Sequence, residues 1–331
     1  MGVGRVAPAG WRKLGPCSSP RILGQRKLSS PTSSELLANF MSTRSIVSII
    51  SLSVPLIAAI ILFLYGSPSI PAAASSVLAF LHPSASSTAS STMSSIRRAA
   101  PMVFTPSGRH TATVIFIHGL GDSGHGWADA VQHWQGKNKL NEVKFILPHA
   151  PAIPITMNAG FQMPGWFDIK SIDALSHAAN TAPEEDEAGI ALSREYIYSL
   201  VQAEVAAGIA SDRIVLGGFS QGGAMSIFAG LLAPFKLGGV VGLSSWLLLN
   251  RTFKDRVPAD SPNRDTPVFM GHGDRDPLVL YPLAQASEKK LTELGYKVSF
   301  KTYPGMQHSA CIEELNDVEA FLQSRLPPQN K

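Results

Sequence analysis

The sequence predicts an α/β protein in which helices cover both faces of a mostly parallel central sheet. Short apolar runs alternate with longer helical patterns between residues 111 and 326, as in strands joined by crossover helices. Runs such as 111–117 are continuously apolar, which indicates strands buried on both faces. Glycine-rich turns follow several runs directly, at the sheet edge where such proteins hold their functional groups.

Two segments between the strands are distinctive. Residues 148–182 lack a regular pattern, and because so long a loop in a compact domain is usually functional, we expect it to form a wall of a substrate groove. The helix expected at 184–207 starts with acidic residues, which the helix dipole favours, and Gly208 ends it. The expected strands are 111–117, 143–147, 214–216, 239–243, 267–270 and 297–303, and the expected helices are 126–134, 184–207, 224–232, 278–294 and 311–326.

Ser220 lies in a pentapeptide, residues 218–222, that matches G-x-S-x-G. A sharp turn from a buried strand into a packed helix needs glycine two residues before and after the serine, and it leaves the hydroxyl exposed at the end of the sheet. The pentapeptide alone would also fit an idle serine in a glycine-rich turn. The apolar run before it and the helical pattern after it favour the nucleophile elbow of the α/β-hydrolase fold.

The other catalytic groups are expected in turns after later strands. Asp276 lies three residues past the glycine of a G-x-x-D turn, and Asp274 is the alternative, more suited to bonding the turn's own amides. His308 follows the last strand and can reach the serine. The order Ser220, Asp276, His308 is that of α/β hydrolases and not of chymotrypsin or subtilisin. Among the other histidines, His118 and His272 are expected to brace their loops.

The oxyanion hole is expected at two backbone N–H groups. Leu120 follows the first strand in a His-Gly turn, and Gln221 follows the nucleophile. Losing one such donor typically costs about 3–4 kcal/mol of transition-state stabilisation. The mechanism that these residues predict needs no metal and no cofactor.

The chain divides into a leader, residues 1–92, and a single catalytic domain, residues 93–331. The leader carries seven Lys/Arg against one acid, whereas the remainder has a net charge of −2, so the basic balance does not indicate nucleic-acid binding by the domain. The chain's two cysteines, Cys17 and Cys311, indicate neither a disulfide framework nor a thiolate metal site and suit a reducing compartment. Cys311 is expected to be a buried thiol at a helix start.

The leader contains a basic serine-rich segment, an apolar stretch at 45–65 and a low-complexity linker. Three interpretations stay open. The apolar stretch can be a membrane signal anchor, the leader can be a mitochondrial presequence, or translation can begin at Met93.

From about Met93 to its end, the chain resembles the acyl-protein thioesterase 1 family in its fungal form. The matching residues are 116–122, 126–127, 166–168, 185–190, 213–223, 272–279 and 303–309. The resemblance implies hydrolysis of the thioester between palmitate and cysteine in proteins such as G-protein α subunits and Ras-like proteins, with minor lysophospholipase activity. It also implies Ser220, Asp276 and His308 as the triad.

The resemblance further implies a cytosolic enzyme, with a nuclear pool, that touches membranes peripherally. A membrane anchor or mitochondrial import would apply only if the leader is translated. Two alternatives remain open at this point: a general carboxylesterase or lysophospholipase of the same fold, and an inactive membrane-tethered binding module. The sequence does not indicate an oligomeric state.

Overall fold

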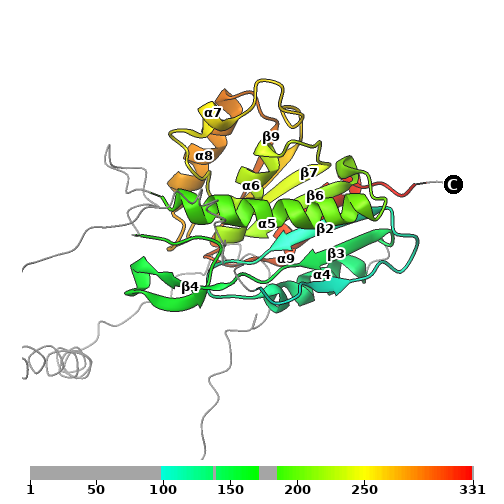
Figure 1. Cartoon of the computed structure of the whole chain (residues 1–331), viewed down its shortest axis with the longest axis horizontal. Helices are drawn as coiled ribbons and strands as arrows, with labels where there is room; N and C mark the ends of the chain where they lie inside the picture. Colours follow the sequence, from blue (N-terminus) through cyan, green and yellow to red (C-terminus); the bar gives the residue numbers. More distant parts are fainter. Residues whose placement is uncertain (1–97, 137–138, 171–184, 330–331) are drawn as a thin grey trace, which may run out of the picture. The chain divides into compact units, whose positions relative to one another are not determined.

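A computed structural model describes residues 98–136, 139–170 and 185–329. Its centre is a seven-stranded sheet in the order β1-β3-β2-β6-β7-β8-β9 (Figure 1). All neighbours in it pair in parallel except β1, which runs antiparallel to β3 at the edge. The strands are β1 (Met102–Phe104), β2 (Ala112–Ile117), β3 (Val143–Leu147), β6 (Ile214–Phe219), β7 (Gly239–Leu243), β8 (Val268–Gly273) and β9 (Val298–Tyr303).

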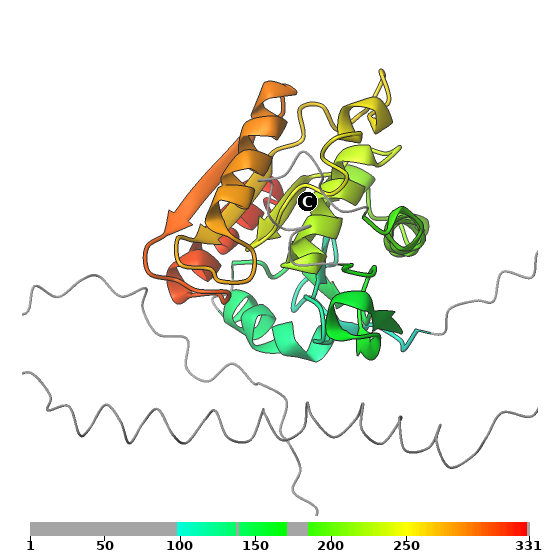
Figure 2. The same cartoon turned by 90° about the vertical axis from the view of Figure 1, so that its left-hand side faces the viewer.

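Helices cover both faces of this sheet, as the sequence predicted (Figure 2). On one face α5, α6 and α8 pack over alternate strand residues such as Ile115 and Leu216. On the other face α4 and α9 pack over Val114, Phe116 and Val215. The helices are α4 (Ala128–Gln135), α5 (Glu187–Ala206), α6 (Gln221–Leu232), α7 (Phe253–Arg256), α8 (Tyr281–Glu293) and α9 (Ile312–Arg325), with short 3-10 turns η1 (Gly124–Trp127), η2 (Thr156–Asn158) and η4 (Ser211–Arg213).

Strand β6 extends beyond the residues 214–216 that the sequence indicated, because Gly217 and Gly218 belong to the sheet and not to a turn. A Cβ at Gly217 would lie 2.8 Å from the Phe116 ring, and one at Gly218 would lie 2.5 Å from the Gly222 backbone. Only a residue without a side chain fits at either position. Both glycines pair with β2 and β7, and the strand continues to Phe219.

Part of the segment expected to be irregular is a hairpin. Strands β4 (Ala152–Ile155) and β5 (Phe161–Pro164) pair antiparallel, with Ile155 opposite Phe161. Prolines in this stretch obscured the pattern, yet proline is tolerated in a two-stranded sheet that offers only edges. Residues 171–184 of the expected wall lie outside the described residues.

The predicted leader, 1–92, and its apolar stretch 45–65 also lie outside the described residues, so the domain division stays a prediction. Within the described ranges, the longest helices are too short or too polar to cross a bilayer.

Candidate active site

Ser220 occupies a strained turn between β6 and α6. Its φ of 53° and ψ of −122° are values that residues with a side chain rarely adopt. The end of β7 holds this turn, because the Ser220 N–H donates to the Leu243 oxygen at 2.8 Å. A Cβ at Gly222 would lie 2.1 Å from the Ile117 oxygen, so only glycine fits two residues after the serine. These are the features of a nucleophile elbow.

His308 and Asp276 form the second part of the site. His308 Nδ1 lies 2.7 Å from Asp276 Oδ2, and the carboxylate side chain is fully buried while 14% of the histidine side chain is exposed. The other carboxylate oxygen, Oδ1, accepts the N–H groups of Leu278 and Val279, both at 2.9 Å. The turn after β8 therefore fixes the carboxylate, and the carboxylate fixes the imidazole.

The charge of this pair follows from its contacts. Burial raises the pKa of the Asp276 carboxyl, but the hydrogen bond and charge of His308, with the two backbone N–H groups, outweigh burial and hold that pKa below its usual value. An ionised Asp276 can only accept, so His308 carries a proton on Nδ1. Its Nε2 is then the nitrogen that can take a proton from a nucleophile.

Asp274, the alternative acid, does not reach His308. It is exposed, and its Oδ1 accepts the Gly305 N–H at 2.6 Å. It therefore ties the turn after β8 to the turn after β9, in the turn-stabilising role that the sequence suggested for it. His272 also braces this turn, with Nε2 2.8 Å from the Val279 oxygen.

The His308 ring lies beside the nucleophile turn. Its centroid is 4.7 Å from that of Phe219, the residue immediately before Ser220. The three turns that hold Ser220, Asp276 and His308 follow β6, β8 and β9, and parallel strands bring such turns to one edge of the sheet.

The two expected oxyanion donors belong to main-chain segments next to Ser220. Gln221 is the first residue of α6, where a helix has backbone N–H groups without intrahelical partners. Leu120 follows Gly119, where a Cβ would lie 3.2 Å from the Ser220 Cβ. The main chain at Gly119 therefore runs directly beside the nucleophile.

His118 stands behind this loop as a brace. Its ring is fully buried, with Nδ1 2.7 Å from the Gly119 oxygen, and its Nε2 accepts the Ala150 N–H at 3.1 Å. Burial lowers the pKa of His118 to about 4, so the ring is neutral at physiological pH and can accept that hydrogen bond. The sequence predicted the bracing role.

Sequence reasoning missed the buried groups that join these loops. The Gln221 side chain and Trp166 are 0% and 2% exposed and bond each other and the loop around His118. The motif match indicated a backbone role for Gln221. The sequence did contain a signal for a side-chain role, because Gln221 is a polar residue at the start of an otherwise apolar helix pattern.

Cys311 corrects another expectation. It precedes α9 and is 5% exposed, but it is disulfide-bonded and not the thiol expected from the sequence. Within 98–136, 139–170 and 185–329, no three His, Cys, Asp or Glu side chains converge in a way that could hold a metal ion.

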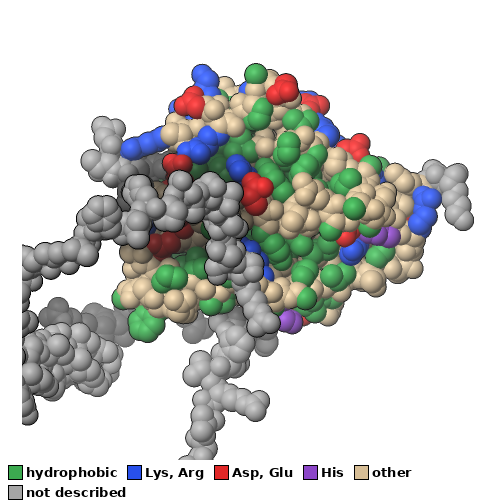
Figure 3. Space-filling model, viewed as in Figure 1, with side chains coloured by type: hydrophobic (Ala, Val, Ile, Leu, Met, Phe, Trp, Pro, Cys, Tyr) green, Lys and Arg blue, Asp and Glu red, His purple; other side chains and the backbone are tan. Residues whose placement is uncertain are grey.

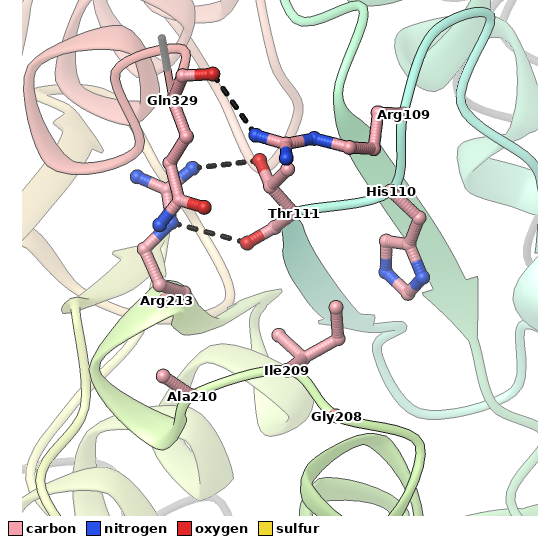
Figure 4. A pocket seen from close by; sticks show the side chains of 8 residues that line it. All are labelled: Arg109, His110, Thr111, Gly208, Ile209, Ala210, Arg213 and Gln329. Atoms are coloured by element: carbon pink, nitrogen blue, oxygen red, sulfur yellow. Dashed lines mark hydrogen bonds between the residues drawn. The ribbon is translucent and has the colours of Figure 1, made fainter. Parts of the chain in front are cut away.

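A pocket of about 390 Å³ lies at the other end of the strands from the catalytic turns, where β2 and β6 begin (Figure 4). Arg213 spans it, donating to the Thr111 main-chain and side-chain oxygens at 3.1 and 3.0 Å and to the Pro327 oxygen at 2.9 Å. Arg109 donates to the Gln329 oxygen. These bonds tie the C-terminal segment to the sheet, so the pocket is a structural junction far from Ser220.

A family model described as Phospholipase/Carboxylesterase matches residues 98–326. The chain belongs to this family. Its α/β-hydrolase fold and its nature as a hydrolase, both predicted from the sequence, are thereby confirmed.

Two curated fungal relatives are both named acyl-protein thioesterase 1. The chain is 57% identical to the Gibberella zeae protein over 70% of its own length and 98% of the relative's, and 56% identical to the Neurospora crassa protein over 71% and 95%. The predicted resemblance to the fungal acyl-protein thioesterases is confirmed.

Solved structures of plant relatives extend the comparison. Acyl-protein thioesterase 2 of Zea mays is 30% identical, with a TM-score of 0.60 over 68% of this chain and 98% of the maize chain. SOBER1 of Arabidopsis thaliana is 30% identical, with a TM-score of 0.59 over 65% of this chain and 99% of the plant chain.

Proposed function

We propose that this protein is an acyl-protein thioesterase, a serine hydrolase that releases palmitate from S-acylated cysteines in proteins. The observation that carries the proposal is the buried His308–Asp276 hydrogen bond beside a strained serine elbow. The names of the fungal relatives supply the bond type and the substrate class. G-protein α subunits and Ras-like proteins are the substrates that we propose.

The residues supply each step of a two-stage acyl transfer. His308 Nε2 takes the Ser220 proton as Oγ attacks the thioester carbonyl, and the Leu120 and Gln221 N–H groups stabilise the oxyanion. His308 returns the proton to the departing cysteine sulfur as the C–S bond breaks. Water then repeats the sequence on the acyl-serine and releases the fatty acid.

Substitution of the nucleophile tests this assignment. Ser220→Ala should abolish hydrolysis of a palmitoylated protein and labelling by a serine-directed phosphonate, while the fold stays intact by circular dichroism. Labelling that persists in Ser220→Ala would show that another residue is the nucleophile.

A second candidate is a carboxylesterase or lysophospholipase acting on oxygen esters. The description of the matching family favours it, and nothing in a serine-histidine pair distinguishes sulfur from oxygen as the leaving atom. Comparing kcat/KM for a palmitoyl-thioester peptide, a lysophospholipid and a short-chain ester decides between the two. A thioester value at least tenfold above both esters supports the thioesterase.

We also propose peripheral contact with membranes, because the fatty chain of an S-acylated protein lies in the bilayer. The β4–β5 hairpin carries Phe161 with 73% of its surface exposed, and hydrophobic side chains gather over this hairpin at the lower left of Figure 3. Phe161→Ser should weaken cosedimentation with phospholipid vesicles without changing hydrolysis of a soluble short-chain ester. Unchanged cosedimentation would count against contact through the hairpin.

The cytosol, with a nuclear fraction, is the compartment that we propose, since S-acylated signalling proteins of this kind face the cytosol. Cell fractionation and the size of the natural protein on an immunoblot test the proposal. Recovery with mitochondria or as an integral membrane protein would favour one of the two leader hypotheses instead.

A further inference from the structure

Both segments expected to form the oxyanion hole are bonded to a common third segment, residues 164–167, which we call the 164–167 brace. The Trp166 indole N–H donates to the His118 oxygen at 2.8 Å, and the Gly121 N–H donates to the Pro164 oxygen at 2.8 Å. Leu120 lies between His118 and Gly121. The main chain around one proposed donor is therefore held from both sides by the brace.

The same brace holds the other segment through the Gln221 side chain. The Trp166 N–H donates to Gln221 Oε1 at 2.9 Å, and Gln221 Nε2 donates to the Phe167 oxygen at 2.7 Å. All three residues are at most 3% exposed. Only one orientation of the carboxamide satisfies both bonds, so the side chain is locked, and with it the start of α6.

The brace is itself fixed to the rigid part of the fold. The Ser193 hydroxyl of α5 donates to the Trp166 oxygen, and the Asp168 N–H donates to the Asp186 carboxylate at 2.9 Å, at the start of the same helix. A Cβ at Gly165 would lie 3.1 Å from Leu120 Cδ1, so the brace packs directly on the side chain of the residue whose N–H it positions.

We propose that the Gln221 carboxamide and the Trp166 indole are positioning groups that set the separation and direction of the two oxyanion donors. Neither touches the reacting atoms. Oxyanion donors accelerate a reaction because they are already aimed at the developing charge, so a loosened frame costs rate even when both donors remain. The proposal rests on the proposed catalytic site, and it does not depend on which acyl bond is the natural one.

Removing the frame should lower turnover more than substrate binding. In the full chain, Gln221→Met keeps the side-chain length but loses both bonds, and we expect kcat on 4-nitrophenyl acetate to fall about 10–100-fold with KM changed less than about threefold. Trp166→Phe keeps a ring beside His118 and loses only the indole bond, so we expect a kcat loss of about 3–10-fold.

A charge-switched variant adds a readout that a purely structural role would not move. In Gln221→Glu the protonated carboxyl can still accept from Trp166 and donate to Phe167, whereas the ionised carboxylate has no donor and faces a carbonyl oxygen. The variant should therefore approach wild-type kcat at low pH and lose activity as pH rises, a limb that the wild type lacks. Burial places this limb above the usual range for glutamate.

Two results would overturn the proposal: a folded Gln221→Met variant with kcat within threefold of wild type, or a Gln221→Glu pH profile that superimposes on the wild-type profile. If Gln221→Met does not fold by circular dichroism, Trp166→Phe and Gln221→Glu decide. Because 4-nitrophenyl acetate reports Ser220 chemistry alone, a wild type active on it but inactive on palmitoylated protein refutes the proposed substrate and leaves this test in force.

Discussion

His308 owes its chemistry to the one carboxylate that it touches. Two aspartates lie two residues apart in the turn after β8, and the backbone gives them opposite environments. Asp276 points inward, is fully buried and accepts from His308, Leu278 and Val279, whereas Asp274 is exposed and accepts from Gly305. The same residue type therefore orients a base at one position and joins two turns at the other.

Substituting each aspartate in turn separates these roles. Asp276→Asn should lower kcat about 10³–10⁴-fold, because the amide favours the wrong tautomer of His308. Asp274→Asn keeps an acceptor for the Gly305 N–H and should lower kcat less than about tenfold. Steady-state kinetics on one ester substrate measures both, and equal losses would contradict the assignment.

At the scale of elements, the start of α5 holds the segment after β7. Glu185 Oε2 accepts the N–H of Leu249, whose φ is 49°, and Arg256 of α7 pairs with Glu187 at 2.6 Å. Burial raises the pKa of the Glu185 carboxyl to about 7, with the charge of Glu187 adding to the shift, although the Leu249 hydrogen bond and the charge of Arg256 oppose it.

Because the pKa of Glu185 is raised in the folded protein, its contribution to the free energy of unfolding falls as the pH rises. An unfolded glutamate ionises near pH 4.5, so between pH 4.5 and 7 the unfolded chain gives up the proton first, and the contribution of Glu185 to the free energy of unfolding falls, by up to about 3 kcal/mol. Glu185→Gln keeps the acceptor for Leu249 and cannot ionise. It should unfold at a higher urea concentration than wild type at pH 8 and at a similar one at pH 4.5.

The control is Glu187→Gln, which removes a partly exposed ion pair with Arg256 and the charge that adds to the Glu185 shift, and it should change stability by less than about 1 kcal/mol. A Glu185→Gln variant that is less stable than wild type at pH 8 would mean that the ionised carboxylate, and not the neutral acid, supports the Leu249 turn.

The elements also show what sequence patterns can and cannot predict. Runs of apolar and small residues identified β2 and β7, because strands buried on both faces show no alternation, and β3 was identified from apolar residues interrupted by Lys144. The ends of β6 and β8 were missed since glycines such as Gly218 look like turn residues, and their role is a close approach to a distant backbone. The catalytic turns were predictable because they follow strands directly. The Gln221–Trp166 contact was not, because it joins residues 55 positions apart.

At the scale of the whole molecule, the carboxyl ends and the amino ends of the parallel strands have separate roles. The turns with Ser220, Asp276 and His308 lie at the carboxyl ends of the strands. At the amino ends, Arg213 binds the C-terminal segment to the sheet. A substitution at the amino ends of the strands should therefore alter the free energy of unfolding without altering catalysis.

Arg213→Ala tests this division. It removes three hydrogen bonds to Thr111 and Pro327, and we expect the free energy of unfolding to fall by about 1–2 kcal/mol with kcat and KM unchanged. Arg109→Ala, which loses one exposed bond to Gln329, is the milder control. Chemical denaturation and ester kinetics measure the two properties, and a large fall in kcat for Arg213→Ala would show that the two ends of the strands are coupled.

The backbone at Ser220 has a consequence for engineering. A position with φ near 53° suits glycine better than any residue with a side chain, so Ser220→Gly would relieve strain while discarding the nucleophile. Selection for heat resistance alone would then enrich inert variants, and a thermostable library of this enzyme has to be screened for turnover as well.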